Sequence, residues 1–429
     1  MNKSKLIALS FLTAMFTACS SDEPKIGFEE NEANSYVAKR SIEEAIEIAS
    51  QYANQTTAET RATKLVVDKS TVSAIVSTTS RALSDTLMYA VNFEDNNGYM
   101  IISANKATVP VLAIIDSGNY QEDEEVKVDG FDYFMNAAEN YVDSYSQVDA
   151  PGIGGTGEGP VDMIMVFYTD SMAVEKCYEQ RLNVKWGEYW PENLYCPNGL
   201  AGCSPVAIAQ VLSYFKPEMD MDITFSGRPY NHLKIDWDEL LEHTSSTDSK
   251  FMSFSHSNTC KATDEAHKHL AVLVRQIGEL TGSTYNTSIT LTPESSTFSV
   301  TKDILSDRTI IKVENEDFYD YLVDGGIALV EGYSAAEGHH TWVLDGTASI
   351  NYKILYYTYF NPRTHEYSTL EVSYRRHNYV HCNWGLSGSK NGYFYEGVYN
   401  TENGHQFDLS ILSVPSRTEY TGVYGYVYK

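Results

Sequence analysis

The segment from Gly199 to Pro217 constrains the fold most, because it joins a glycine-bearing loop to a helix that is apolar on nearly every side. Pro205 fits the first turn of a helix, where a missing N–H costs nothing, and Pro217 marks the helix end. A helix that is apolar all round must be buried between other elements. The sequence therefore predicts a central helix enclosed by the rest of its domain, with Cys203 at its N-terminus.

Cys203 occupies a position at which a thiol is well suited to act as a nucleophile. The macrodipole and the free backbone N–H groups at a helix start favour a thiolate and can also bind an oxyanion. A lone cysteine is otherwise commonly a buried structural residue, and the sequence around Cys203 supports both interpretations equally. A nucleophilic role requires a base elsewhere in the chain.

A candidate base lies within residues 325–346, where two predicted strands are joined by a short polar loop. Period-two alternation places His340 at the start of the second strand, on the same face as Trp342 and Leu344. The neighbouring His339 points to the opposite face. A single histidine is more often a structural side chain, but one at a strand start beside a loop is well placed to act as a base.

A third segment, residues 381–394, holds a candidate orienting group. The side-chain oxygen of Asn383 can accept a hydrogen bond from the second ring nitrogen of a base and so fix its tautomer, and Trp384 can shield that bond from water. The alternative is a turn that carries a core tryptophan. His340 follows Cys203 by 137 residues, which is the spacing of papain-like enzymes.

The chain divides into two parts and a connection. Residues 41–53 have apolar residues at helical spacing after a capping Ser, and the turn signal at 96–98 joins two strand-like runs. The strand-like runs are 64–67, 86–93, 99–103 and 110–115. The Gly- and Pro-rich stretch at 147–160 predicts a flexible linker. A short helix-rich stretch and then a long strand-dominated region are expected after it.

The N-terminus carries an export signal. Lys3 and Lys5 precede an apolar run at residues 6–18 that is too short to cross a bilayer. The small residues before Cys19 resemble a bacterial lipobox, with Phe16 in place of the usual Leu, so Cys19 is the expected lipid-modified first residue of the mature protein. The alternative is an ordinary signal peptide with an incidental cysteine. The protein is expected at the outer membrane or cell surface, with the periplasm as the alternative, and a lipid anchor is its only expected membrane contact.

Three segments together resemble the streptopain family of secreted cysteine peptidases: the loop and helix GCSPVAIAQVLSYF, the strand GHHTWVLDG and the turn NWGLSGSKNGYF. The unit around residues 91–112 resembles the inhibitory prosegment of that family. The resemblance implies an α+β papain-like fold, with a helical part and an antiparallel β part, preceded by a small α+β prosegment. The site residues that it implies are Cys203 as nucleophile, His340 as general base and acid, Asn383 as orienting residue and Trp384 as its cover.

The resemblance also implies a domain division and an activity. The expected parts are a lipoprotein signal peptide at 1–19, an inhibitory prosegment at 20–146, the linker at 147–160 and a papain-like catalytic domain at 161–429. The chain would be an exported cysteine endopeptidase, made as a zymogen, that cleaves peptide bonds through a thioester intermediate. Its expected partners are protein or peptide substrates and its own prosegment, and no cofactor or metal is expected.

One departure from the family pattern affects the chemistry. The family has Trp-x-Gln before the nucleophile, with the Gln amide donating to the oxyanion, whereas the matching residues here are Trp186, Gly187 and Glu188. An ionised carboxylate opposes the developing negative charge, and loss of one such donor typically costs on the order of 10²–10³ in rate. Glu188 can still donate if it is protonated. The alternative function is therefore a catalytically weak or inactive homologue that binds peptides or proteins as a surface lipoprotein.

The charge balance of 31 Lys and Arg against 58 Asp and Glu gives a net charge of −27, which argues against a nucleic-acid partner. Both residues 20–150 and residues 151–429 carry an excess of acidic side chains. Because like charges repel, the prosegment is expected to dock on the catalytic domain through apolar and backbone contacts.

The other cysteine and histidine residues give weaker signals. His267 and His269, with His256 and Cys260 nearby, lack the standard spacing of metal ligands. Cys177 and Cys196 flank the candidate site, and the sequence leaves open whether they form a disulfide.

Overall fold

A computed structural model describes the following residues of the 429-residue chain: 39–56, 64–76, 86–121, 129–146, 164–178, 180–244, 265–314, 318–334, 338–361, 366–399 and 420–429. The predicted signal peptide with Cys19, the predicted linker at 147–160, and both His256 and Cys260 lie outside the described residues. Within the described ranges, no helix combines the length and the apolar character that a membrane crossing requires.

The described chain is a mixed α and β structure with one dominant antiparallel sheet. The helices are α1 (Ile42–Gln55), α2 (Asp129–Ser146), α3 (Cys203–Phe215), α4 (Trp237–Thr244), α5 (Glu265–Leu280), α6 (Glu294–Ile304), α7 (Phe318–Val323) and α8 (Glu396–Tyr399). The strands of the large sheet are β1 (Val67–Val76), β2 (Thr86–Phe93), β3 (Tyr99–Ser103), β4 (Val111–Ile115), β5 (Ile164–Tyr178), β10 (Ile310–Glu314), β11 (Ile327–Ser334), β12 (Gly338–Asn361), β13 (Glu366–Asn383), β14 (Gly392–Tyr395) and β15 (Tyr420–Tyr428). Two short hairpins, β6 (Asp220–Asp222) with β7 (His232–Lys234) and β8 (Thr284–Tyr285) with β9 (Thr290–Leu291), complete the list.

In the N-terminal part, α1 and β2 to β4 form as the sequence predicts, whereas β1 is displaced along the chain and α2 was not predicted. Ser41 caps α1, because its side chain accepts from the Glu44 backbone N–H while the Glu44 side chain accepts from the Ser41 N–H. Gly98 has a φ of +95° in the turn between β2 and β3, a conformation that glycine adopts without steric cost. Strands β2, β3 and β4 agree with the predicted runs to within a residue, whereas β1 begins at Val67, where the predicted run ends.

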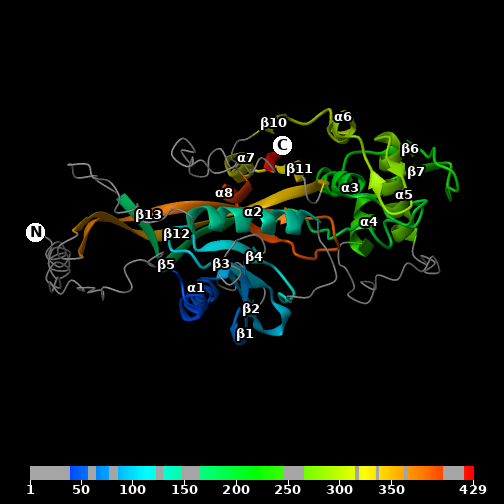
Figure 1. The fold of residues 1–429 in the computed structure, drawn as a ribbon. Helices are drawn as coiled ribbons and strands as arrows, with labels where there is room; N and C mark the ends of the chain where they lie inside the picture. Colours follow the sequence, from blue (N-terminus) through cyan, green and yellow to red (C-terminus); the bar gives the residue numbers. More distant parts are fainter. Residues whose placement is uncertain are drawn as a thin grey trace, which may run out of the picture.

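The strands of the predicted prosegment and those of the predicted catalytic domain belong to one continuous sheet. Its strand order is β1-β2-β3-β4-β14-β13-β12-β11-β15-β10, with β5 paired to the outer part of β12. The join is the antiparallel pair of β4 with β14, in which Ile115 lies opposite Gly392 and Ala113 opposite Phe394. A Cβ on Gly392 would lie 2.2 Å from the Ile114 carbonyl oxygen, so only glycine allows this close approach. Figure 1 shows α1 and β1 to β4 beneath the long β12–β13 hairpin.

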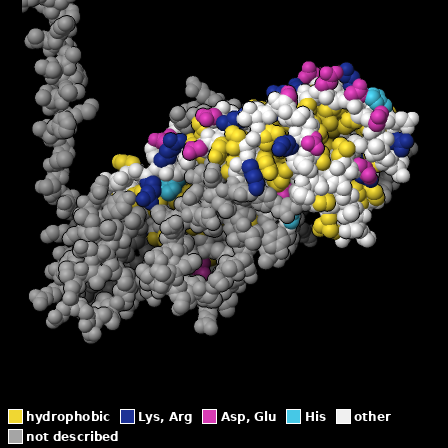
Figure 2. Space-filling view, turned by 90° about the horizontal axis from the view of Figure 1, so that it is seen from above, with side chains coloured by type: hydrophobic (Ala, Val, Ile, Leu, Met, Phe, Trp, Pro, Cys, Tyr) yellow, Lys and Arg dark blue, Asp and Glu magenta, His cyan; other side chains and the backbone are white. Residues whose placement is uncertain are grey.

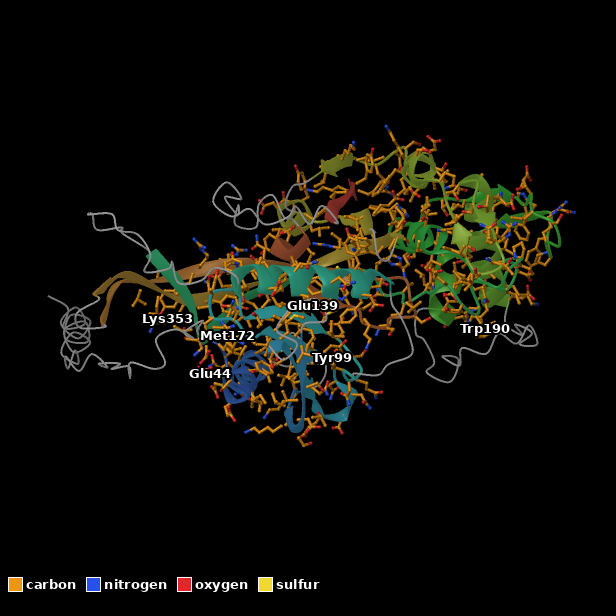
Figure 3. All side chains as sticks on the ribbon, in the orientation of Figure 1. Glu44, Tyr99, Glu139, Met172, Trp190 and Lys353 are labelled. Atoms are coloured by element: carbon orange, nitrogen blue, oxygen red, sulfur yellow. The ribbon has the colours of Figure 1, made fainter. Side chains whose placement is uncertain are left out.

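The helical part of the catalytic domain surrounds α3. Every side chain from Ser204 to Ser213 is buried, and Gly202 and Lys216 flank the helix with positive φ values. In Figure 1, α3, α4 and α5 gather at one end of the molecule, and the Trp190 label in Figure 3 lies in the same part. The predicted central helix is therefore confirmed.

The prediction of a helix-rich stretch followed by a strand-dominated region is wrong in its order. Residues 164–178 form the strand β5, and the five helices α3 to α7 follow between residues 203 and 323, ahead of most of the catalytic strands. Helix α5 alone buries a continuous series from Leu270 to Gly278. Periodicity separates short helices from strands poorly in short windows, and the sequence analysis assigned no individual elements in this region.

Candidate active site

Three chemically active side chains converge at the N-terminus of α3. Cys203 is the first residue of α3, His340 is the third residue of β12, and Glu188 lies in the loop before the helix. One carboxylate oxygen of Glu188, the Cys203 Sγ and one ring nitrogen of His340 all lie within 4.8 Å of one another. Cys203 and Glu188 are partly exposed, and His340 is buried. The two residues chosen from the sequence as nucleophile and base thus lie in one site. Glu188, the residue that differs from the family pattern, lies there as well.

The His340 ring is fixed by two tryptophans and a backbone carbonyl. Its Nε2 lies 3.1 Å from the carbonyl oxygen of Trp384. Because a carbonyl oxygen only accepts, Nε2 carries a proton and the lone pair of a neutral ring is on Nδ1. The ring stacks on Trp342 at 5.9 Å between centroids and 15° between planes, and the Trp384 ring lies 6.5 Å away. This arrangement gives His340 the tautomer that a base needs.

Asn383 lies beside the site but its contacts differ from the expected ones. Its Oδ1 accepts from Gln210 Nε2 at 3.1 Å, and its Nδ2 donates to the Val184 carbonyl at 2.9 Å. The hydrogen-bond acceptor of His340 Nε2 is the carbonyl of the next residue, Trp384. The physical reason is that Asn383 is the last residue of β13 and its side chain lies against α3, where the buried Gln210 amide donates to it. Asn383 therefore positions the turn that carries the Trp384 carbonyl and does not contact the His340 ring through a hydrogen bond.

Gln210 is a site residue that the sequence analysis missed. It is fully buried in α3, and its Nε2 donates both to Asn383 Oδ1 and to the Trp186 carbonyl at 3.1 Å. The side chain therefore joins the loop that holds Glu188 to the turn that orients His340. The available signal was a single amide in the middle of an otherwise apolar helix, because a buried polar group is expected to have a defined partner.

Glu192 fixes the loop that carries Glu188. Its Oε1 accepts from the Gly187 N–H at 3.0 Å, and the Ala201 N–H donates to the Glu188 carbonyl at 2.9 Å. Burial raises the pKa of Glu192 to about 8, so the carboxyl is largely neutral below that pH. The backbone of Glu188 is thus held from both sides. The Glu188 carboxylate therefore lies near the Cys203 thiol on a loop whose backbone is held by hydrogen bonds.

His339 lies on the opposite face of β12, as the alternation predicted. Its Nε2 is 3.4 Å from the fully buried carboxylate of Glu331, which also accepts from the Thr341 hydroxyl at 3.3 Å. Thr341 in turn lies 2.8 Å from the Ser204 hydroxyl, next to the nucleophile. This buried polar chain ties the start of α3 to β11 and β12 from behind the site.

Helix α2 of the predicted prosegment covers His340. A Cβ at Gly130 would lie 2.3 Å from Trp384 Cε3 and 2.7 Å from His340 Cδ2. Phe134 packs edge-on against Phe394 at 4.7 Å, and Tyr133 lies 6.4 Å from Trp342. Figure 3 marks this helix by Glu139, over the middle of the sheet. The backbone of α2 at Gly130 therefore packs directly against the side chains of Trp384 and His340.

Replacement of Gly130 by Ala is expected to weaken the packing of α2 against Trp384 and His340. The new methyl group overlaps two aromatic rings, and overpacking of this kind typically costs about 1–3 kcal/mol, or about 5- to 150-fold in an equilibrium constant. The measurement is the rate at which the purified full chain processes itself. The matched control is Asn136→Ala, an exposed position on the same helix. Unchanged or slower processing of the Gly130 variant would show that α2 does not hold the site closed.

A buried ion pair also crosses from the prosegment to the catalytic domain. His381 Nε2 lies 2.9 Å from Asp116 Oδ2, and its Nδ1 lies 2.5 Å from Asp345 Oδ1. Burial lowers the pKa of His381, but the two carboxylates outweigh it and raise the pKa to about 10. The expectation that docking rests on apolar and backbone contacts is therefore incomplete, because a charged contact joins the two parts as well. The sequence alone could not predict a contact between residues so far apart in the chain.

Zymogen stability is expected to decline at alkaline pH. Because the pKa of His381 rises from 6.5 in its ordinary state to about 10 in the fold, the stabilisation is fully present below pH 6.5 and is lost as pH rises through 10. Replacement of Asp116 by Asn removes the prosegment carboxylate and is expected to cost about 1.5–3 kcal/mol, the usual contribution of a hydrogen bond to a charged group.

Urea unfolding of the full chain at several pH values between 6 and 10 measures both effects. The variant is expected to lose stability at pH 6 and to show a weaker pH dependence than the unaltered chain. If the free energy of unfolding changed with pH equally in both proteins across this range, the contact of Asp116 with His381 would not be the source of the pH dependence.

The other cysteine and histidine candidates that the structure describes have contacts of their own. Cys196 is a free, buried thiol, and burial raises its pKa to about 12; the side chain of Cys177 lies outside the described part of the chain. The His267 ring packs on Trp190 at 5.3 Å, and the His269 ring packs on Tyr230 at 5.6 Å.

Two segments of the chain match known protein families. The model of the peptidase C10 family matches residues 183–394, and the model described as Spi protease inhibitor matches residues 34–142. Among solved structures, a fragment of prointerpain A from Prevotella intermedia is 15% identical, with a TM-score of 0.47, over 81% of this chain and 96% of that one. No curated protein matches the chain. Residues 183–394 belong to the peptidase C10 family, the streptopain family, and an inhibitor segment lies ahead of them in the chain.

Proposed function

We propose that the chain is the zymogen of a cysteine endopeptidase in which Cys203 is the nucleophile and His340 the general base and acid. The observation that carries this proposal is the convergence of the Cys203 thiol with a His340 ring whose Nε2 is bound by the Trp384 carbonyl. A nucleophile, a base and a group that orients the base are the parts that acyl transfer by a thiol requires.

The proposed reaction begins with attack of Cys203 Sγ on the scissile carbonyl carbon. The thiol proton passes to Nδ1 of His340, which then delivers it to the leaving amine as the carbon–nitrogen bond breaks. The acyl group remains on Cys203 as a thioester. Water then attacks the thioester with His340 as base, which releases the carboxylic acid and restores the thiol.

The developing oxyanion has one clear stabilising group and one opposing one. The first N–H groups of α3 have no acceptor within the helix and are the proposed donors to the oxyanion. The Glu188 carboxylate lies within 4.8 Å of the thiol and opposes negative charge there when it is ionised. This observation favours the second candidate function, a catalytically weak or inactive homologue that binds peptides or proteins.

A peptide that carries a thiol-reactive epoxide distinguishes the two functions. The full chain is allowed to process itself, or is processed by an added protease, and is then incubated with the probe. Labelling that maps to Cys203 and is absent from the His340→Ala variant supports the peptidase. An unlabelled Cys203 in protein that has lost its prosegment would support the binding homologue.

We also propose that residues 20–146 are the removable inhibitor, that residues 161–429 are the catalytic domain, and that the mature chain is exported and anchored by lipid at Cys19. The N-terminal sequence supports this location. The proposed partners are peptide or protein substrates and not nucleic acid; Figure 2 shows basic side chains scattered among acidic and apolar ones on the described part of one face. The Cys19→Ala variant is expected to leave the membrane fraction of the producing cell, and its retention there would contradict the anchor.

A further inference from the structure

The exchange of Gln for Glu at position 188 creates a set of metal-binding groups at the catalytic centre. Cys203 offers a thiolate sulfur, His340 an imidazole nitrogen and Glu188 a carboxylate oxygen, and these atoms lie within 4.8 Å of one another. Thiolate, imidazole and carboxylate are the ligands that zinc(II) takes in proteins. A Gln amide in the same place would leave only two such ligands.

The distances suit a zinc ion after a small closure. Tetrahedral zinc with bonds of about 2.0–2.3 Å holds its ligand atoms roughly 3.3–3.6 Å apart. Because the three atoms lie within 4.8 Å of one another, the set needs to close by at most roughly 1–1.5 Å to reach that spacing, a movement within reach of small side-chain rotations. Three protein ligands leave the fourth position for a water molecule, as in zinc sites with an open coordination position.

The second shell of the site is already present. A histidine that binds a metal commonly donates its other ring N–H to a carbonyl or carboxylate, and His340 Nε2 faces the Trp384 carbonyl at 3.1 Å. The Nδ1 lone pair is therefore available to the ion. The Glu188 backbone is held on both sides, by the Gly187 contact with Glu192 and by the Ala201 N–H.

The charges of the three groups also balance a divalent cation. A thiolate and a carboxylate at this separation repel each other when no cation lies between them. Together they carry two negative charges, which one zinc ion neutralises, and its binding releases the thiol proton. The sulfur lone pair is then bound to the metal and cannot attack a carbonyl carbon.

We propose that Glu188, Cys203 and His340 form a reversible zinc(II) site that holds the peptidase inactive. The inhibitory consequence rests on the proposed function, whereas the metal site itself does not. Removal of the ion by a chelator restores the nucleophile without any covalent change.

Cobalt(II) serves as the probe, because a bound thiolate gives it a charge-transfer absorption that no carboxylate or imidazole produces. The full chain is titrated with cobalt(II), and zinc(II) is then added to displace it. The unaltered chain is expected to show the thiolate band at one ion per chain, and the Cys203→Ser variant is expected to lack it. Glu188→Gln is expected to weaken zinc binding at least 10- to 100-fold, because loss of an outer-sphere partner alone has that effect.

A surface variant controls for adventitious metal binding. His232 contacts Asp220 and Asp222 on the exposed β6–β7 hairpin, and His232→Ala is expected to leave the thiolate band unchanged. An absent band, or equal zinc affinity in the unaltered chain and Glu188→Gln, would overturn the metal site. If the band appears but no peptide is cleaved with or without chelator, the peptidase proposal fails and the metal site stands.

Discussion

Replacement of Cys203 by Ser is expected to lower the rate of peptide hydrolysis by roughly 10⁴-fold or more, since the components of a nucleophile and base act as a unit. The hydroxyl is a much weaker nucleophile than the thiol, and the His340 ring is placed to accept a proton from the Cys203 position. The measurement is cleavage of an internally quenched peptide by the processed chain in the presence of reductant and chelator.

The matched control is Cys196→Ala, which removes a buried thiol from the same part of the molecule. Its rate per folded molecule is expected to equal that of the unaltered chain, although its stability falls. Equal rates for the Cys203 variant and the unaltered chain would mean that another residue is the nucleophile.

Replacement of Glu188 by Gln is expected to raise the turnover rate of the chelated, processed enzyme by up to roughly 10²–10³-fold, the usual effect of one oxyanion donor. The amide N–H₂ group donates to the oxyanion, whereas a carboxylate at the same place repels it when it is ionised. Because the loop backbone is held by Glu192 and Ala201, the amide is expected to occupy the same place as the carboxylate.

The control that keeps the charge is Glu188→Asp, which is expected to remain as slow as the unaltered chain. The presence of a chelator separates this effect from zinc binding, because the gain persists when no metal is present. An unchanged or lower rate for the Gln variant would show that the carboxylate does not oppose the oxyanion.

The local parts of the site follow from short stretches of sequence. The apolar helix predicts its own burial and puts Cys203 at its start, and strand alternation separates His340 from His339. Each of these predictions uses residues within one helix or strand. The repeat of that element determines on which face a side chain lies.

The parts that sequence could not predict depend on contacts between distant residues. The Trp384 carbonyl takes the place expected for the Asn383 side chain because Gln210, from another element, binds that side chain. The pairing of β4 with β14 and the contact of Asp116 with His381 join residues more than 260 positions apart. Periodicity holds no information on such partners.

The continuous sheet has a consequence for maturation. Loss of the prosegment removes β4 from β14 and uncovers a strand edge, together with the aromatic face that α2 covers. An uncovered edge can pair with another extended chain. On the proposed maturation, the remaining chain would gain an edge strand and an apolar surface beside the candidate site at the same step that uncovers Cys203 and His340.

The most direct measurement of the central claim is capture of the acyl group on Cys203. The processed chain is mixed with excess peptide ester, stopped in acid within one turnover, digested and mapped by mass spectrometry. The account predicts that the peptide containing Cys203 gains the mass of the acyl group, and that the gain is absent from Cys203→Ala. Turnover of the ester with no acyl group on Cys203, or with the acyl group on another residue, would contradict it.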